Sequence, residues 1–220
     1  MAIYNQSDRA FTLTGAKMSS LNSSAPTPLG FFLSSDLSFL LSIPQCVGIR
    51  LYNVVTTTII SPVKDDGFEM EHIYFQSRSI PGTDLTQNAI FHNRANASQL
   101  ANMGSINSRF SSFYSKDVLE GILASGKDGV VIYELDLNSI SPADLDNPQD
   151  PIISADRSHL IVAVDLINGM LPTEFPLSGE NRMSNHPCPG HCLHRNGVSV
   201  VAFSSQQTSN PGDPYLFRWQ

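Results

Sequence analysis

Two stretches of the chain carry the same pattern of residues. Phe32 to Tyr52 and Phe113 to Tyr133 align without a gap at a constant offset of 81 positions. Five aligned pairs are identical, namely Phe32/Phe113, Ser34/Ser115, Asp36/Asp117, Gly48/Gly129 and Tyr52/Tyr133. We interpret the pattern as an internal duplication. It limits the possible folds, because both copies must then form the same local structure.

Each copy reads as a short helix followed by a strand. Both helices are predicted to begin with a capping serine and to carry a first-turn aspartate, which suits the positive end of the helix dipole; these residues are Ser34 and Asp36, and Ser115 and Asp117. Pro44 ends the first helix and Gly126 ends the second. Runs of β-branched and aromatic residues then predict strands over 47–55 and 129–137.

The segments around these helices extend each copy. A further strand is predicted to begin at His72 in the first copy and at His159 in the second. Apolar residues spaced three and four apart predict an upstream helix over 13–21 and another over 100–110. Each copy therefore reads as an ααββ unit.

From these units we predict an α+β fold. Two diverged ααββ units are expected to pack as a pseudo-symmetric pair, with a mostly antiparallel sheet and helices on one face. The first unit spans residues 1–84. The second spans 85–204 and includes an acidic, proline-rich loop and a loop rich in cysteine and histidine, and residues 205–220 form an aromatic C-terminal tail.

Residues 31–52 combine a Phe-Phe start, the pair Asp36-Leu37 and the strand Gln45-Cys-Val-Gly-Ile-Arg-Leu-Tyr52, and a Cys-Pro segment occurs near the C-terminus. In these features the chain resembles an uncharacterised family of small bacterial proteins found mainly in Bacteroidetes. The resemblance implies a tandem version of that family's single unit. It supports the unit boundaries and implies no activity, because the family has no known function to transfer.

Charge and hydropathy exclude two classes of partner. The net charge is −7 and the Lys and Arg residues are scattered, so we predict no binding to nucleic acid. No apolar stretch approaches the ~20 residues of a membrane-spanning helix. The N-terminus lacks a basic start followed by an apolar run, which predicts a cytoplasmic protein and leaves export by a signal-independent route open.

Charged residues make up only 15% of the chain, against about 25% in an average protein. Because charged residues are depleted from the cores of interfaces, this composition favours a chain that packs against copies of itself or against another subunit. The alternative is a small monomer that relies on hydroxyl and amide groups for solubility.

Thiol and imidazole groups are concentrated near the C-terminus, and these are ligand types that zinc prefers. The candidate metal ligands are His186, Cys188, His191, Cys192 and His194. A second pair of ligands is missing from the local sequence, although Cys46, His72 or His159 could complete the set in space. The alternatives are a surface loop with reduced thiols and a Cys188–Cys192 disulfide. We therefore predict no cofactor, with zinc as the alternative.

Two other motifs are rejected. Gly121 to Asp128 resembles a phosphate-binding loop, but its last position is a carboxylate where a magnesium-binding hydroxyl is needed, and a helix precedes it where a strand should be. The acidic loop contains Asp144, Asp146, Asn147 and Asp150 but lacks the glycine and the final glutamate of a calcium loop, so we interpret it as solvated.

The aromatic tail is the candidate interaction segment. Its anchors are Tyr215, Phe217 and Trp219, which are costly to expose and are expected to dock on the protein's own core or on a neighbour. With no catalytic motif found, we expect a non-enzymatic structural or interaction protein that self-assembles or joins a larger assembly. The alternatives are a zinc- or thiol-dependent enzyme or regulator centred on residues 186–194, and a small-ligand module between the copies.

Overall fold

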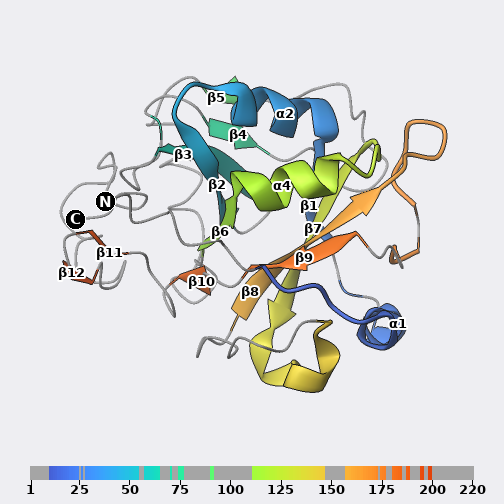
Figure 1. Ribbon diagram of the computed structural model, residues 1–220. Helices are drawn as coiled ribbons and strands as arrows, with labels where there is room; N and C mark the ends of the chain where they lie inside the picture. Colours follow the sequence, from blue (N-terminus) through green and yellow to red (C-terminus); the bar gives the residue numbers. More distant parts are fainter. Residues whose placement is uncertain are drawn as a thin grey trace.

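The computed structural model describes residues 10–24, 26, 28–54, 57–64, 70, 74–76, 90–91, 111–146, 157–172, 174–176, 180–184, 187–188, 194–195 and 198–199. These residues form antiparallel sheets and helices (Figure 1), which confirms the predicted α+β class and the mostly antiparallel pairing. Among the described residues, none of the helices is long and apolar enough to cross a membrane.

The smaller of the two main sheets has four strands in the order β1-β7-β8-β9. Its strands are β1 (Pro28–Leu33), β7 (Gly129–Asp136), β8 (Arg157–Val164) and β9 (Asn181–Met183). Nearly every residue of β7 and β8 is buried. Both faces of this sheet are therefore covered, which explains why the two strands read as continuous apolar runs.

The larger sheet has six strands in the order β10-β6-β2-β3-β4-β5. Its strands are β2 (Cys46–Val54), β3 (Thr57–Lys64), β4 (Tyr74–Gln76), β5 (Ile90–Phe91), β6 (Ser111–Ser115) and β10 (Pro187–Cys188). A separate pair consists of β11 (His194–Arg195) and β12 (Val198–Ser199). The sequence pattern predicts a single strand for the β2 and β3 region, and it does not predict β6.

Three α-helices and two short 3₁₀ helices are described: α1 (Gly15–Ser24), α2 (Ser34–Ser42), α4 (Lys116–Leu123), η2 (Leu137–Ser139) and η3 (Pro142–Asp144). Ser115 caps α4 as predicted, since its side chain accepts a hydrogen bond from the Val118 amide. The prediction for Ser34 was wrong by one residue. Leu33 is the N-cap of α2, and the Ser34 hydroxyl donates instead to the Lys127 carbonyl at 2.7 Å.

Each of the two similar stretches includes a strand that precedes its helix. β1 leads into α2, and β6 leads into α4. These leading strands are exchanged: β1 pairs with β7 of the other stretch, and β6 pairs with β2. The two predicted units are therefore joined through both sheets, and common ancestry of the stretches stays a prediction.

Two glycines mark corresponding positions in these pairings. A side chain on Gly48 would overlap the Tyr114 carbonyl and the Phe113 ring, and a side chain on Gly129 would overlap the Phe32 carbonyl and the Phe31 ring. By position, Phe113 therefore corresponds to Phe31 and not to Phe32. The gap-free alignment is therefore shifted by one residue in β1 and β6. The reason is that the first stretch has one more residue between Phe31 and Gly48 than the second has between Phe113 and Gly129.

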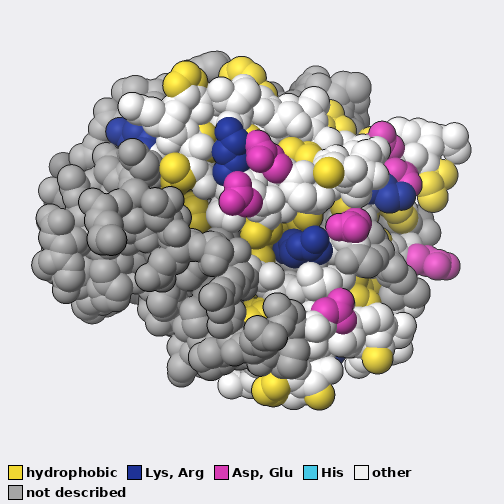
Figure 2. Space-filling view, viewed as in Figure 1, with side chains coloured by type: hydrophobic (Ala, Val, Ile, Leu, Met, Phe, Trp, Pro, Cys, Tyr) yellow, Lys and Arg dark blue, Asp and Glu magenta, His cyan; other side chains and the backbone are white. Residues whose placement is uncertain are grey.

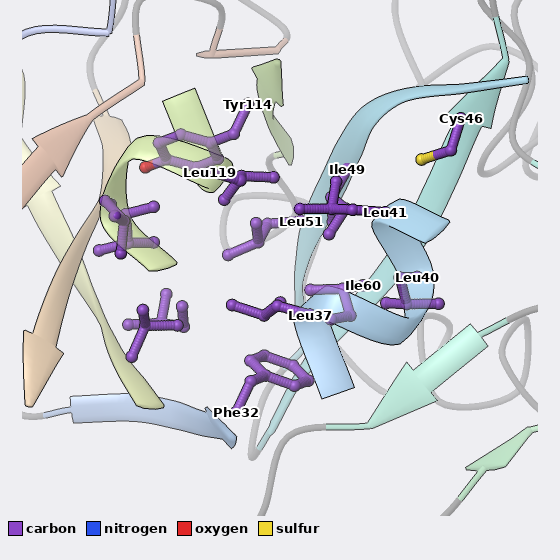
Figure 3. Packing of buried hydrophobic residues seen from close by; sticks show 14 of the residues in the cluster. Phe32, Leu37, Leu40, Leu41, Cys46, Ile49, Leu51, Ile60, Tyr114 and Leu119 are labelled. Carbon is purple, nitrogen blue, oxygen red and sulfur yellow. The ribbon is translucent and has the colours of Figure 1, made fainter. Parts of the chain in front are cut away.

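The core consists of two apolar clusters on opposite faces of the four-stranded sheet. Helices α2 and α4 lie side by side and pack against the first cluster, between the two sheets (Figure 1). Figure 3 shows the leucines of α2 lying over β2 and β3 in this cluster. The second cluster includes Met18 of α1 together with Phe31 and Val131. The helices thus do not share one face, because α1 covers the face opposite to α2.

Two further predicted elements are present in the structure. The helix expected over 13–21 is α1, and the strand expected from His159 is β8. The helix expected over 100–110 and the whole C-terminal tail lie outside the described residues.

The crowding at the two glycines leads to a prediction. Replacing Gly48 or Gly129 by alanine should lower the free energy of unfolding by about 1–3 kcal/mol, because backbone and ring atoms occupy the space of the new methyl group. Gly121 is the control, since it lies in α4 and an added methyl group would meet no atom within 4 Å. Gly121→Ala should stabilise the protein by about 0.5–1 kcal/mol. Urea unfolding of the three variants measures both effects, and equal effects at all three sites would contradict the packing described.

Candidate functional site

A cluster of polar side chains lies buried where β6 meets β8 and β9. Its members are Ser112 and Tyr114 of β6, Ser158 and His159 of β8, and Ser184, which follows β9. Each is at most 2% exposed. Polar groups are seldom buried without hydrogen bonds, because desolvation costs free energy, so such a cluster is the first place to look for a specific role.

His159 is the centre of the cluster. Its ring nitrogen Nδ1 lies 2.8 Å from the Ser112 hydroxyl oxygen, and its backbone amide donates to the same oxygen at 3.3 Å. Its carbonyl accepts hydrogen bonds from the Tyr114 hydroxyl at 2.6 Å and from the Ser184 amide at 3.1 Å. One residue of β8 is thus bound to both the six-stranded sheet and the end of β9.

The serine hydroxyls complete the connections between the sheets. Ser184 donates to the Phe113 carbonyl at 2.8 Å, and Ser158 donates to the Ser184 carbonyl at 3.0 Å. The Tyr114 hydroxyl also lies 3.3 Å from the Arg182 carbonyl. In Figure 3 the Tyr114 hydroxyl points away from α2 and toward the four-stranded sheet. The cluster therefore links strands that belong to different sheets.

The electrostatics of the cluster keep the imidazole neutral. Burial lowers the pKa of His159 from 6.5 to about 3, because the protonated ring would lose its hydration. A serine hydroxyl beside a neutral imidazole is also the geometry of an activated nucleophile. Here, however, Ser112 and His159 both have an exposed fraction of zero. The pair is positioned to bind the sheets together and does not reach solvent.

His159 is expected from the sequence as a candidate ligand, paired with His72 of the other copy. His72 lies outside the described residues. β3 pairs with β2 in the same way as β8 pairs with β7. On β3, the position that corresponds to His159 is occupied by Thr58. The sequence reasoning missed Ser112, Tyr114 and Ser184. Serines in a strand are the available signal, but the sequence pattern does not predict β6 itself.

Cys46 is buried among the apolar residues of the first cluster, and its thiol lies 3.3 Å from the Gly48 carbonyl oxygen. Burial raises the pKa of this thiol, although its hydrogen bonds and Lys116 oppose the shift. The described residues hold no group of three or more His, Cys, Asp and Glu side chains that could bind a metal ion. Cys46 therefore acts as a core residue in this structure.

Of the predicted zinc ligands, the structure describes the backbone of Cys188 and His194. Cys188 lies on β10, opposite Ser111, and His194 lies on β11. The side chains of both residues, and all of His186, His191 and Cys192, lie outside the described residues. The zinc site and the thiol alternative stay predictions. The same holds for Tyr215, Phe217 and Trp219 as interaction anchors.

The two rejected motifs have structural roles. The segment resembling a phosphate loop connects α4 to β7, and Lys127 within it forms an ion pair with Asp165 at 2.6 Å. In the acidic loop, the Asp144 carboxylate accepts hydrogen bonds from the Ser141 amide and hydroxyl at 2.7 and 2.9 Å. These bonds lower the pKa of Asp144 and cap η3. Asp144 thus stabilises a turn.

The Tyr114 hydroxyl offers a direct test of the cluster. Tyr114→Phe should lower the free energy of unfolding by about 1–2 kcal/mol, because the His159 carbonyl loses its shortest hydrogen bond inside the protein. Tyr133→Phe is the matched control, since Tyr133 is also buried but its hydroxyl makes no hydrogen bond among the described residues. Denaturant unfolding should show a clear loss for the first variant and little change for the second. Equal losses would mean that the cluster does not stabilise the sheet junction.

Comparison of the chain with models of protein families, with curated proteins and with solved structures finds no match. The resemblance to a bacterial family drawn from residues 31–52 thus stays a prediction. Any function must be inferred from the surface and the interior of this chain.

Proposed function

We propose that the protein is a non-enzymatic structural or interaction protein whose partner is a second copy of itself. The observation that supports this proposal is the solvent-facing side of α2. Phe39 on that side is 57% exposed, and the other exposed residues of the helix are the three serines Ser35, Ser38 and Ser42. We call these four residues the α2 face.

The opposite side of α2 holds the helix to the protein. That inner side buries Leu37, Leu40 and Leu41, each at most 3% exposed. Half-exposed aromatic rings are costly in water and are frequent as anchors at the centre of interfaces. The small serines around Phe39 would let a partner surface approach the ring closely.

Charge favours a second copy at this place. A net charge of −7 makes two copies repel each other over most of their surface. The only charged residue of α2 is Asp36, whose carboxylate turns back to accept a hydrogen bond from the Leu33 amide at 3.3 Å. In Figure 2 the surface over α2 is mostly white and yellow, and the nearest acidic and basic side chains lie over α4. Two α2 faces can thus approach without bringing like charges together.

The buried cluster supports a structural role in the same way. Its hydroxyl and imidazole groups are used in hydrogen bonds between strands, as described above. Side chains positioned in this manner strengthen the scaffold that presents α2. The proposal thus assigns the interior to stability and the surface of α2 to association.

The α2 face predicts the effect of one substitution on assembly. Phe39→Ser should weaken self-association at least tenfold, since a tenfold change corresponds to about 1.4 kcal/mol and loss of a central aromatic anchor typically costs about 2 kcal/mol or more. Ile167→Ser is the matched control, because Ile167 is 60% exposed but belongs to the turn that pairs it with Met170 and not to α2. Sedimentation velocity over a range of micromolar concentrations measures the change.

Two results would contradict the proposal. One is a wild-type protein that stays monomeric throughout the concentration range, and the other is equal weakening by Phe39→Ser and Ile167→Ser. Deleting residues 215–220 distinguishes the contribution of the α2 face to assembly from that of the aromatic tail. Assembly that is lost only on this deletion would depend on the tail. Native mass spectrometry of the same samples would also detect a bound zinc ion.

A further inference from the structure

A tight turn follows β8 at one end of the four-stranded sheet. Asn168 and Gly169 form its centre, and the flanking residues Ile167 and Met170 exchange backbone hydrogen bonds of 2.8 and 3.0 Å. Both central residues have positive φ angles, 53° at Asn168 and 76° at Gly169, as is typical of Asn-Gly in a two-residue turn. In Figure 1 the turn projects beyond the end of β8. We call residues 167–170, all of them exposed, the Asn-Gly turn.

We propose that Asn168 is a site of spontaneous covalent modification, in which its side chain cyclises onto the Gly169 nitrogen and is then hydrolysed. In the first step the Gly169 nitrogen forms a bond to Cγ of Asn168, and the bond from Cγ to Nδ2 breaks. Nδ2 leaves as ammonia and takes the proton of the Gly169 amide with it. In the second step water opens the imide ring. Attack at Cγ gives aspartate, and attack at the backbone carbonyl carbon gives isoaspartate.

The attacking nitrogen is accessible. Gly169 has no side chain to shield it, and even an added methyl group at this position would meet no atom within 4 Å. Among the residues that the structure describes, neither the Gly169 amide nor the Asn168 carboxamide makes a hydrogen bond. Neither reacting group therefore has to break a hydrogen bond of its own.

The turn has to open before the ring can close. The left-handed conformation of Asn168 directs the next nitrogen away from its side chain, so the reaction requires rotation about the bond between Cα and the carbonyl carbon. Opening breaks two hydrogen bonds and uncovers little apolar surface, because Ile167 and Met170 are already 60% and 59% exposed. Exposed tips of this kind open locally at a small cost in free energy.

Contacts before the turn limit the opening to its tip. Lys127 and Asp165 form an ion pair at 2.6 Å, and the Asp128 carboxylate accepts a 2.8 Å hydrogen bond from the Leu166 amide. Both contacts hold the end of β8 to the segment that connects α4 to β7. The four-stranded sheet can therefore stay folded while the turn opens.

Two other asparagines are held in place by hydrogen bonds. Asn138 is exposed, but its carboxamide donates to Asp136 at 3.0 Å, and a serine follows it in the chain. Asn181 is buried, and its carboxamide bonds to both the amide and the carbonyl of Leu13. Each of these side chains must lose a hydrogen bond before it can cyclise. Among the three, the structure thus leaves Asn168 the most reactive.

The modification would change the surface of the turn in two ways. Either product places a negative charge between Ile167 and Met170, which are apolar and exposed. Isoaspartate also adds a carbon atom to the backbone. Because the length of a two-residue turn fixes its geometry, the added atom should break the hydrogen bonds that close the turn.

Peptide mapping of the full-length protein by mass spectrometry tests the proposal, after incubation at neutral and at mildly alkaline pH. Asn168 should convert to aspartate and isoaspartate, and faster at the higher pH because hydroxide removes the proton of the Gly169 amide. Asn138 and Asn181 should stay intact in the same digest. Another Asn-Gly pair, at 196–197, lies outside the described residues, and trypsin places it on a different peptide.

Two variants separate the effect of the sequence from that of the structure. Asn168→Gln should abolish the conversion, because the longer side chain cannot form the five-membered ring. Ser139→Gly gives Asn138 a following glycine and keeps its hydrogen bond to Asp136. In that variant Asn138 should still react roughly fivefold more slowly than Asn168, since a hydrogen bond of about 1 kcal/mol must break first.

The chain unfolded in urea provides the reference rate for both asparagines. Three results would overturn the proposal. The first is an Asn168 that stays intact in the folded protein while it reacts in urea. The second is equal reaction of Asn138 and Asn168 in folded Ser139→Gly. The third is conversion at position 168 that continues at the wild-type rate in Asn168→Gln.

Discussion

β1 forms its hydrogen bonds with β7, and β6 forms its hydrogen bonds with β2, so each of the two similar stretches receives a strand from the other. The rest of the fold depends on this exchange. It brings the helix that follows β1 next to the helix that follows β6, and both then pack between the sheets. Neither stretch could bury its apolar helix face by itself.

Glycine makes the exchange possible at close range. At Gly48 and Gly129 the carbonyl and the aromatic ring of the incoming strand occupy the space where a side chain would lie. The ring covers the partner backbone, which would otherwise be exposed on the strand face. One physical requirement thus accounts for two residues that are identical in the sequence comparison and for the aromatic residues opposite them.

The polar cluster shows how the same architecture can be completed with different chemistry. A buried hydroxyl lowers stability unless its hydrogen bonds are made, and the hydroxyls of Tyr114, Ser184 and Ser158 donate to the backbone carbonyls of His159, Phe113 and Ser184. At the corresponding register positions, β1 has Phe32 where β6 has Tyr114, and Gly30 where β6 has Ser112. Hydrogen bonds across the junction make the arrangement of the two sheets specific, whereas apolar contacts alone tolerate small shifts.

Helix α2 has one apolar side that faces the core and one polar side that faces solvent. The amphipathic pattern of α2 predicts which residues face the core, and Leu37, Leu40 and Leu41 are buried as that pattern requires. Phe39 lies outside the pattern. An aromatic residue that is mostly exposed on the polar side of a helix is not required by the core, which is why the α2 face is the basis of the proposed association.

The sequence by itself determined the local elements. Pro44 and Gly126 end two helices, Asp36 and Asp117 mark their first turns, and the β-branched runs form β2, β7 and β8. These features depend on backbone propensity and on interactions between residues close in the chain, so a single sequence carries them. β6 and its serines were missed because a short Ser-rich strand has no strong propensity of its own.

Only the tertiary structure decided which strands pair, and therefore which side chains meet. Strand exchange places Ser112 beside His159 across 47 positions of sequence. The pairing of β2 with β3 places Thr58, and not the expected His72, at the position that corresponds to His159. Periodicity reports which face of a strand is apolar but not which strand lies next to it. The buried cluster is therefore a consequence of topology, because long-range pairing depends on how the whole core packs.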